Sequence, residues 1–358
     1  MKSREFAPKL VFLLSQPRAG STMTQKILGS HSMIHTQAEP WVLLHPLHSL
    51  RNENIAATYN QKVNVRGTKG FIESLPGGED EYWAQLGGAY SRMYGSILQG
   101  KRKTIFLDKT PRYYLIANEI PKMFPDSSII CLVRNPFAVL NSIVTTWTRA
   151  KLFTLSRYRQ DLLEAPFILR DILERPGGNI ISLRYEHLVQ EPDILLPRIC
   201  ERLGIPYEAS MVDYNRDTVF SLGDQKTVDV LGAPDVTLQD SWISGLDDPQ
   251  VWRLQREYFD VLGRQVITQL GYDADSIEGI INSLKPSFSS LRSTISLKVL
   301  LDDQRDSLLG LHRMEAVSNN RGEISKSLEY RIGLILTAPF KRFKHVFGMS
   351  TRKIRNKL

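Results

Sequence analysis

The sequence predicts an α/β fold in which a central parallel sheet is covered by helices on both faces. Four short apolar runs with strand character are each followed by a segment with helical periodicity, an alternation typical of parallel sheets. The chain has 358 residues, 42% hydrophobic and 23% charged, which suits a globular protein with one large core. The strand and helix pairs are 9–16 with 20–29, 104–108 with 112–123, 128–134 with 136–148, and 179–186 with 190–203.

The first strand leads into a turn with the features of an anion cradle. In residues 9–28, KLVFLLSQPRAGSTMTQKIL, an apolar run breaks at a Pro-Arg-Ala-Gly-Ser-Thr turn and resumes as a helix. Gly20 lets the backbone approach a ligand, Ser21 and Thr22 bring hydroxyls, and the helix start points its amides and positive dipole at the same place. Arg18 adds a permanent charge with a planar donor fork. A phosphate or sulfate group is the expected ligand, although an ordinary strand-to-helix turn has a similar composition.

This turn differs from the P-loop of nucleotide hydrolases, because no Lys precedes Ser21 or Thr22. With Arg18 before a Gly-Ser-Thr turn, it resembles the 5′-phosphosulfate loop of sulfotransferases, whose donor is 3′-phosphoadenosine 5′-phosphosulfate (PAPS). The resemblance implies that Arg18, Ala19, Gly20, Ser21 and Thr22 bind this donor. Ala19 stands where the family often has Ser and Ser21 where it has Thr, so backbone contacts should persist while one hydroxyl contact is lost.

A second element begins at the strand that ends in Arg134, within SIICLVRNPFAVLNSIVTTW (128–147). Arg134 should stand at the carboxyl end of a parallel strand, where open α/β sheets bind ligands, and Ser142 follows about two helical turns later. Pro136 suits the first helical turn. The spacing is similar to the 3′-phosphate element of the sulfotransferase family, which implies that Arg134 and Ser142 hold that phosphate. The alternative is a surface Arg and a helix Ser that face solvent.

A third element lies in residues 179–206, where a strand ends in Arg-Tyr-Glu and a helix closes at Leu-Gly. Gly204 fits the end of that helix. The arrangement resembles the family's strand, Tyr-Glu and LGIP signature, which implies that Tyr185 binds the 3′-phosphate or the adenosine. Tyr185 is equally well explained as a packing residue.

Sulfuryl transfer also needs a base for the acceptor hydroxyl. Glu39 resembles the proposed base of the tyrosylprotein branch, although that branch has two adjacent acidic residues and the first is here Ala38. The alternative is a Glu at a helix start. Other branches of the family use a His base, so the reserve candidates are His35, His45 and His48.

The departing phosphate needs positive charge. Lys109 follows the strand 104–108, and its position resembles the family's Lys assigned to the leaving phosphate. The alternative is a solvated turn Lys paired with Asp108, a kind of pair that contributes little.

The resemblance covers residues 9–273 and implies a P-loop NTPase-like sulfotransferase fold. It also implies metal-independent in-line transfer from PAPS to an acceptor hydroxyl. A carbohydrate or glycoconjugate is the preferred acceptor, and tyrosyl or phenol acceptors are the alternatives. The competing hypotheses are an ATP-dependent small-molecule kinase, which needs a Mg²⁺-binding acid near the loop, and a non-enzymatic nucleotide-binding protein at the membrane.

Residues 1–273 are expected to form the sulfotransferase domain, with a long loop at 217–241, and residues 274–358 a helical, basic extension. From 331 onward there are eight Lys or Arg and no Asp or Glu, which equals the net charge of the whole chain, 46 − 38 = +8. The positive and negative charges of the rest of the chain balance, so no nucleic-acid partner is expected. The apolar run 332–340 followed by basic residues suits an anionic membrane surface, with a solvated tail or a helix docked on a partner as alternatives.

No apolar leader follows Met1, so a cytoplasmic protein is expected. Any contact with a membrane is expected to be peripheral. Cys131 and Cys200 fall on an apolar strand and a core-facing helix, where they are interpreted as small hydrophobic residues. No Cys or His spacing indicates a zinc site, and no metal is expected.

Overall fold

The computed structural model describes residues 8–37, 39–52, 55, 57, 59–148, 151–175, 177, 179–212 and 239–302. The predicted basic membrane segment at 331–358 lies outside these residues, as does nearly all of the predicted loop at 217–241.

Five parallel strands form one sheet in the order β2-β3-β1-β4-β5, which confirms the predicted α/β fold. The four predicted strands are present with small shifts at their ends. The fifth, β2, is a three-residue edge strand, Ile-His-Thr, with no apolar run to predict it. The strands are β1 (Lys9–Ser15), β2 (Ile34–Thr36), β3 (Ile105–Lys109), β4 (Ser128–Val133) and β5 (Ile180–Arg184).

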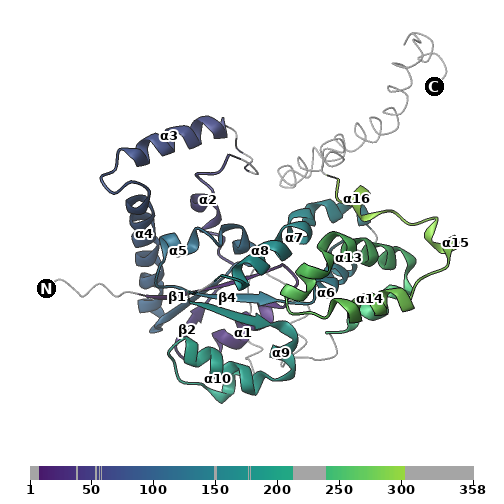
Figure 1. Cartoon of the computed structure of the whole chain (residues 1–358). Coiled ribbons are helices and arrows are strands. Elements are labelled where there is room, and N and C mark those ends of the chain that lie inside the picture. The colour runs from purple at the N-terminus through teal and green to yellow at the C-terminus, as the bar shows by residue number, and fades with distance from the viewer. Residues whose placement is uncertain are drawn as a thin grey trace, which may run out of the picture. The chain divides into compact units, whose positions relative to one another are not determined.

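Helices cover both faces of the sheet, as Figure 1 shows. Strands β1, β3 and β4 are almost wholly buried, which explains their continuous apolar sequences. On one face, Leu13 and Leu107 join a core completed by the helices α1 (Ser21–Gly29), α9 (Tyr185–Gln190) and α10 (Pro192–Arg202). On the other face, Phe12 and Phe106 pack against aromatic rings of other elements, namely Tyr94 of α4 (Gly78–Lys101), Tyr113 of η1 (Pro111–Ile116) and Phe124 after α5 (Ile120–Met123).

The ends of two helices follow the predicted local chemistry. Pro136 opens α6 (Pro136–Ser142), where the Asn135 side chain accepts from the Phe137 amide. Gly204, at φ 63°, closes α10, and the amide of Ile205 reaches back to the Cys200 carbonyl at 3.0 Å.

Both cysteine thiols are buried in this framework, and burial raises the pKa of Cys131 to about 12. The other elements are α2 (Leu44–Leu47), α3 (Gln61–Glu73), the π-helix η2 (Ile143–Thr148), η3 (Leu152–Tyr158), α7 (Arg159–Leu163), α8 (Ala165–Leu173), η4 (Ala209–Met211), α12 (Ser241–Ser244), η6 (Gly245–Asp247), α13 (Pro249–Gln269), α14 (Ala274–Ser283), α15 (Phe288–Leu291) and α16 (Leu297–Leu300).

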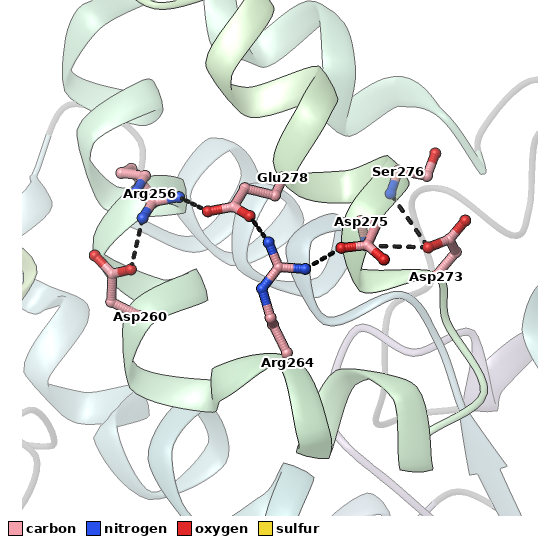
Figure 2. A network of polar contacts seen from close by, with 7 residues as sticks. All are labelled: Arg256, Asp260, Arg264, Asp273, Asp275, Ser276 and Glu278. Atoms are coloured by element: carbon pink, nitrogen blue, oxygen red, sulfur yellow. Dashed lines mark hydrogen bonds and ion pairs between the residues drawn. The ribbon is translucent and has the colours of Figure 1, made fainter.

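Helix α13 is interrupted at Gly263, and ion pairs connect both of its parts to α14. Figure 2 shows Glu278 of α14 accepting from Arg256, before the interruption, at 2.8 Å and from Arg264 after it. Asp273 caps α14 by accepting from the Asp275 amide at 3.0 Å. The compact unit runs from Met1 to Leu297 and includes α14 and α15, which lie beyond the predicted boundary at residue 273. The division at 273 itself stays a prediction.

We expect Gly263→Ala to destabilise the protein by about 1–3 kcal/mol, because its backbone at φ 71° and ψ 156° is in a region that only glycine adopts readily. No atom lies within 4 Å of the position a Cβ would take, so the penalty comes from the backbone alone. Gly279→Ala in α14, equally open and without positive φ, is the matched control and should stabilise by about 0.5–1 kcal/mol. Urea unfolding measures both. Equal effects would contradict the backbone explanation.

Candidate active site

The carboxyl ends of the five parallel strands open onto one edge of the sheet. Strand β1 is central, and the chain places β3 on one side of it and β4 on the other. Ligands of open α/β sheets bind where the strand order reverses in this way. The loop after β1, Lys109 at the end of β3 and Arg134 just after β4 all belong to this edge.

The loop between β1 and α1 presents an open helix start. The amide of Ala19 donates to the Gln16 carbonyl at 3.2 Å, and Arg18 and Gly20 take left-handed conformations at φ 71° and 91°. The first turn of α1 carries no acidic residue, and no side chain caps it in the part of the chain that the structure describes. Its amides and dipole therefore remain available to an anion.

Arg18 and Arg134 lie together, although 116 positions separate them. The Arg134 Nη1 donates to the backbone carbonyl of Arg18 at 3.1 Å, and the Arg18 Nε donates to Ser142 Oγ at 3.0 Å. The two predicted anion elements thus form one contiguous cluster. Arg18 also lies 5.3 Å from the ring centroid of Trp147 in the π-helix η2.

Tyr185 connects the loop to Arg134. A Cβ at Gly20 would come within 2.4 Å of the Tyr185 ring, so only glycine allows the loop to pass over this ring. The Arg134 guanidinium lies 4.2 Å from the centroid of the same Tyr185 ring. Tyr185 is 4% exposed, so it packs as a buried residue and also borders the predicted donor site.

Glu186 is a site residue that sequence reasoning did not assign. Its Oε1 accepts from the Asn135 amide at 2.9 Å and its Oε2 from the Tyr272 hydroxyl at 2.8 Å. It therefore fixes the turn that carries Arg134. The Tyr-Glu pair after β5 was the available signal, but only the Tyr was given a role.

Lys109 and Glu39 form a buried pair beside the start of α1. The Lys109 Nζ donates to Glu39 Oε1 at 2.8 Å and lies 3.5 Å from Thr22 Oγ1. The Lys109 side chain is fully buried and that of Glu39 is 12% exposed. Lys109 is thus no solvated turn residue. Its ammonium donates to Glu39, and its charge also acts to lower the pKa of Asp108.

Asp108 is buried behind the site. Its carboxylate accepts from Tyr94 at 2.7 Å, from Tyr113 at 3.2 Å and from Thr110 at 3.3 Å. Burial raises the pKa of Asp108 to about 7, against the lowering effect of these hydrogen bonds. Tyr113 in turn accepts from the Leu43 amide at 3.3 Å, so the network anchors the chain after Glu39.

The three reserve histidines lie in β2, in α2 and just after α2. The ring of His35 makes an edge-on contact with the ring of Phe106. Phe106 points to one face of the sheet, whereas Leu107 and Lys109 point to the other. Burial lowers the pKa of His35, with Lys101 and Lys103 adding to the effect. His45 and His48 belong to α2 and the turn after it, and burial lowers the pKa of His48 as well.

A metal site is not apparent in the described ranges, since they hold no cluster of three His, Cys, Asp or Glu side chains suited to an ion. None of the helices in these ranges combines the length and apolar character that a membrane crossing requires.

The fold is that of an α/β protein whose strand ends carry the uncapped start of α1 and the cluster of Arg18 and Arg134. The chain belongs to the sulfotransferase family, because the model of the Sulfotransferase family matches residues 8–209. The matched range contains every predicted site residue, and the sulfotransferase resemblance is thereby confirmed.

Two curated proteins and one solved structure show the extent of the similarity. Nodulation protein NoeE of Sinorhizobium fredii is 24% identical over 74% of this chain and 66% of its own length. Protein-tyrosine sulfotransferase A of Caenorhabditis elegans is 23% identical over 58% of this chain and 52% of its own. The chain thus spans less than two thirds of the length of these relatives. The sulfotransferase domain from the curacin biosynthetic pathway has a TM-score of 0.48 at 21% identity, covering 74% of this chain and 98% of that domain.

Proposed function

We propose that the protein transfers a sulfuryl group from PAPS to an acceptor hydroxyl. The observation that carries this proposal is the meeting of Arg18 and Arg134 beside the open start of α1, where Lys109 also lies 3.5 Å from Thr22 and donates to Glu39. Membership of the sulfotransferase family supports the donor and the reaction.

The donor would be held at its two charged ends. The amides of residues 19–22, the hydroxyls of Ser21 and Thr22, and Arg18 would bind the 5′-phosphosulfate. Arg134 and Ser142 would bind the 3′-phosphate, with the Tyr185 ring beside the adenosine. Binding energy gained at the distant phosphate would then position the reacting sulfur. The contact between Arg18 and Ser142 supports placing the two ends in one continuous site.

The chemical step would be an in-line displacement at sulfur. A bond forms between the acceptor oxygen and sulfur, the bond from sulfur to the 5′-phosphate oxygen breaks, and adenosine 3′,5′-bisphosphate departs. Glu39 would take the acceptor proton as base, and Lys109 would offset negative charge on the departing phosphate. Because the side chains already supply this positive charge, the mechanism is proposed without a metal. The distance of 2.8 Å between Lys109 Nζ and Glu39 Oε1 supports a common reaction centre.

The preferred acceptor is a carbohydrate or glycoconjugate. A tyrosyl acceptor stays open, since one relative is named as a protein-tyrosine sulfotransferase. We also propose a cytoplasmic protein whose segment 331–358, with its eight basic residues, contacts an anionic membrane and brings the enzyme to a membrane-bound acceptor.

Labelled donors test the reaction directly. The full chain is incubated with PAPS labelled at sulfur, and separately with ATP labelled at the γ-phosphate, against a panel of alkyl glycosides, glycolipids and tyrosyl peptides. We expect label to move from PAPS to a hydroxyl of one acceptor class. Phosphate transfer from ATP, with none from PAPS, would instead support a kinase.

A further inference from the structure

Trp41 lies two residues after Glu39 and has a backbone conformation that side chains disfavour. Its φ is 58°, in the left-handed region, where such residues persist only if their surroundings hold them. Its amide donates to Thr110 Oγ1 at 3.4 Å, and that hydroxyl donates to the buried Asp108. The network behind the site therefore keeps the Trp41 backbone in place.

The indole of Trp41 contacts the carboxylate of Glu39. Its Nε1–H donates to Glu39 Oε2 at 3.2 Å, while Lys109 donates to Oε1, so each carboxylate oxygen has its own donor. The ring is itself supported, since the Arg112 guanidinium lies 5.8 Å from its centroid. Arg112 is fixed by Asp161, which is 1% exposed and which it binds through Nε at 3.0 Å and Nη2 at 2.7 Å.

Two donors on opposite oxygens define the plane of a carboxylate, whereas one donor leaves it free to rotate. A general base acts only when its oxygen lies within hydrogen-bond reach of the acceptor proton. Each oxygen retains a second lone-pair site for that purpose. We propose that Trp41 is a positioning residue that fixes the Glu39 carboxylate, with Arg112 and Asp161 holding the indole. This inference rests on the proposed role of Glu39 as base.

An indole signal measures the contact without any acceptor. The chain has five tryptophans, so selective ¹⁵N labelling gives few Nε1–H resonances, and Trp41→Phe identifies that of Trp41. We expect this resonance to shift in Glu39→Gln, because the indole N–H then donates to a neutral side-chain amide in place of a carboxylate.

Trp83 provides an internal control in the same spectra. Its Nε1–H donates to Glu79 Oε1 at 2.8 Å, and this hydrogen bond lowers the pKa of Glu79. Its resonance should stay unchanged in Glu39→Gln. A Trp41 resonance that also stays unchanged in Glu39→Gln would overturn the inference, whatever the reaction of the protein proves to be.

Kinetics then tests whether the contact positions the base. In transfer from labelled PAPS to the alkyl glycosides of the panel, Trp41→Phe should lower kcat about 10- to 100-fold, as for one lost hydrogen bond to a charged group, with KM for PAPS unchanged.

The matched control is Trp83→Phe, which removes a hydrogen bond from an indole to a glutamate on α4 and should leave kcat and KM for PAPS unchanged. If Trp41→Phe behaves like Trp83→Phe while Glu39→Gln is inactive, Trp41 is no positioning residue and the base assignment stands. If Glu39→Gln keeps full turnover, the proposed base itself is wrong.

Discussion

Glu39→Gln is expected to lower turnover by about 10²- to 10⁴-fold, the usual contribution of a general base. The substitution keeps the size and the hydrogen-bonding capacity of the side chain but removes its ability to accept a proton. The affinity for adenosine 3′,5′-bisphosphate should persist, because the nucleotide contacts are proposed for Arg18, Arg134 and the loop amides. Sulfuryl transfer from labelled PAPS measures the first quantity and calorimetry the second.

The matched control is Glu79→Gln, which alters another glutamate that accepts from both an indole and a lysine, here Trp83 and Lys122. It should leave turnover unchanged. Full turnover in Glu39→Gln would move the base to one of the histidines, and each His→Ala variant would then be assayed in turn. A joint loss of turnover and nucleotide affinity would indicate that Glu39 supports the fold of the site instead.

Arg134→Ala is expected to remove the preference for nucleotides that carry a 3′-phosphate. A hydrogen bond to a charged group is worth about 1.5–3 kcal/mol, so the ratio of affinities for adenosine 3′,5′-bisphosphate and AMP should fall about 10- to 100-fold. Arg134 also donates to the carbonyl of Arg18 and lies over Tyr185, so affinity for both nucleotides can weaken. The ratio is therefore the informative quantity.

Two further variants separate charge from geometry. Arg170→Ala removes the same charge from α8, where Arg170 pairs with Asp171, and should leave the ratio unchanged. Arg134→Lys keeps the charge but loses the planar donor fork and should fall between wild type and Arg134→Ala. An unaltered ratio in Arg134→Ala would show that the 3′-phosphate lies elsewhere.

The sequence predicted the framework because each core strand is buried on both faces and must be apolar throughout. Strands β1, β3 and β4 follow this pattern, and the residues at their ends face one edge because the sheet is parallel. The edge strand β2 escaped prediction because a three-residue strand held by β3 alone needs no apolar run. Its position depends on a neighbour that lies about 70 residues later, beyond any local signal.

The candidate site was predictable where one residue carries one recognisable feature, as with Gly20 and Arg134. The contacts that hold the segment after Glu39 in place were not predictable. Asp108 anchors the segment after Glu39 through Thr110 and Tyr113, and these links exist only once β3 and η1 are folded. The Trp41 indole gave no signal of its own, because an aromatic residue near an acidic one is usually explained by packing.

The central claim is that two distant parts of the chain bind opposite ends of one nucleotide. Calorimetry of the full-length wild-type protein with adenosine 3′,5′-bisphosphate, AMP and ATP tests it most directly. The account predicts one site per chain, with the bisphosphate bound at least about tenfold more tightly than AMP through one added charged contact, and ATP bound more weakly than the bisphosphate. Equal affinity for the bisphosphate and AMP, or tighter binding of ATP, would contradict it.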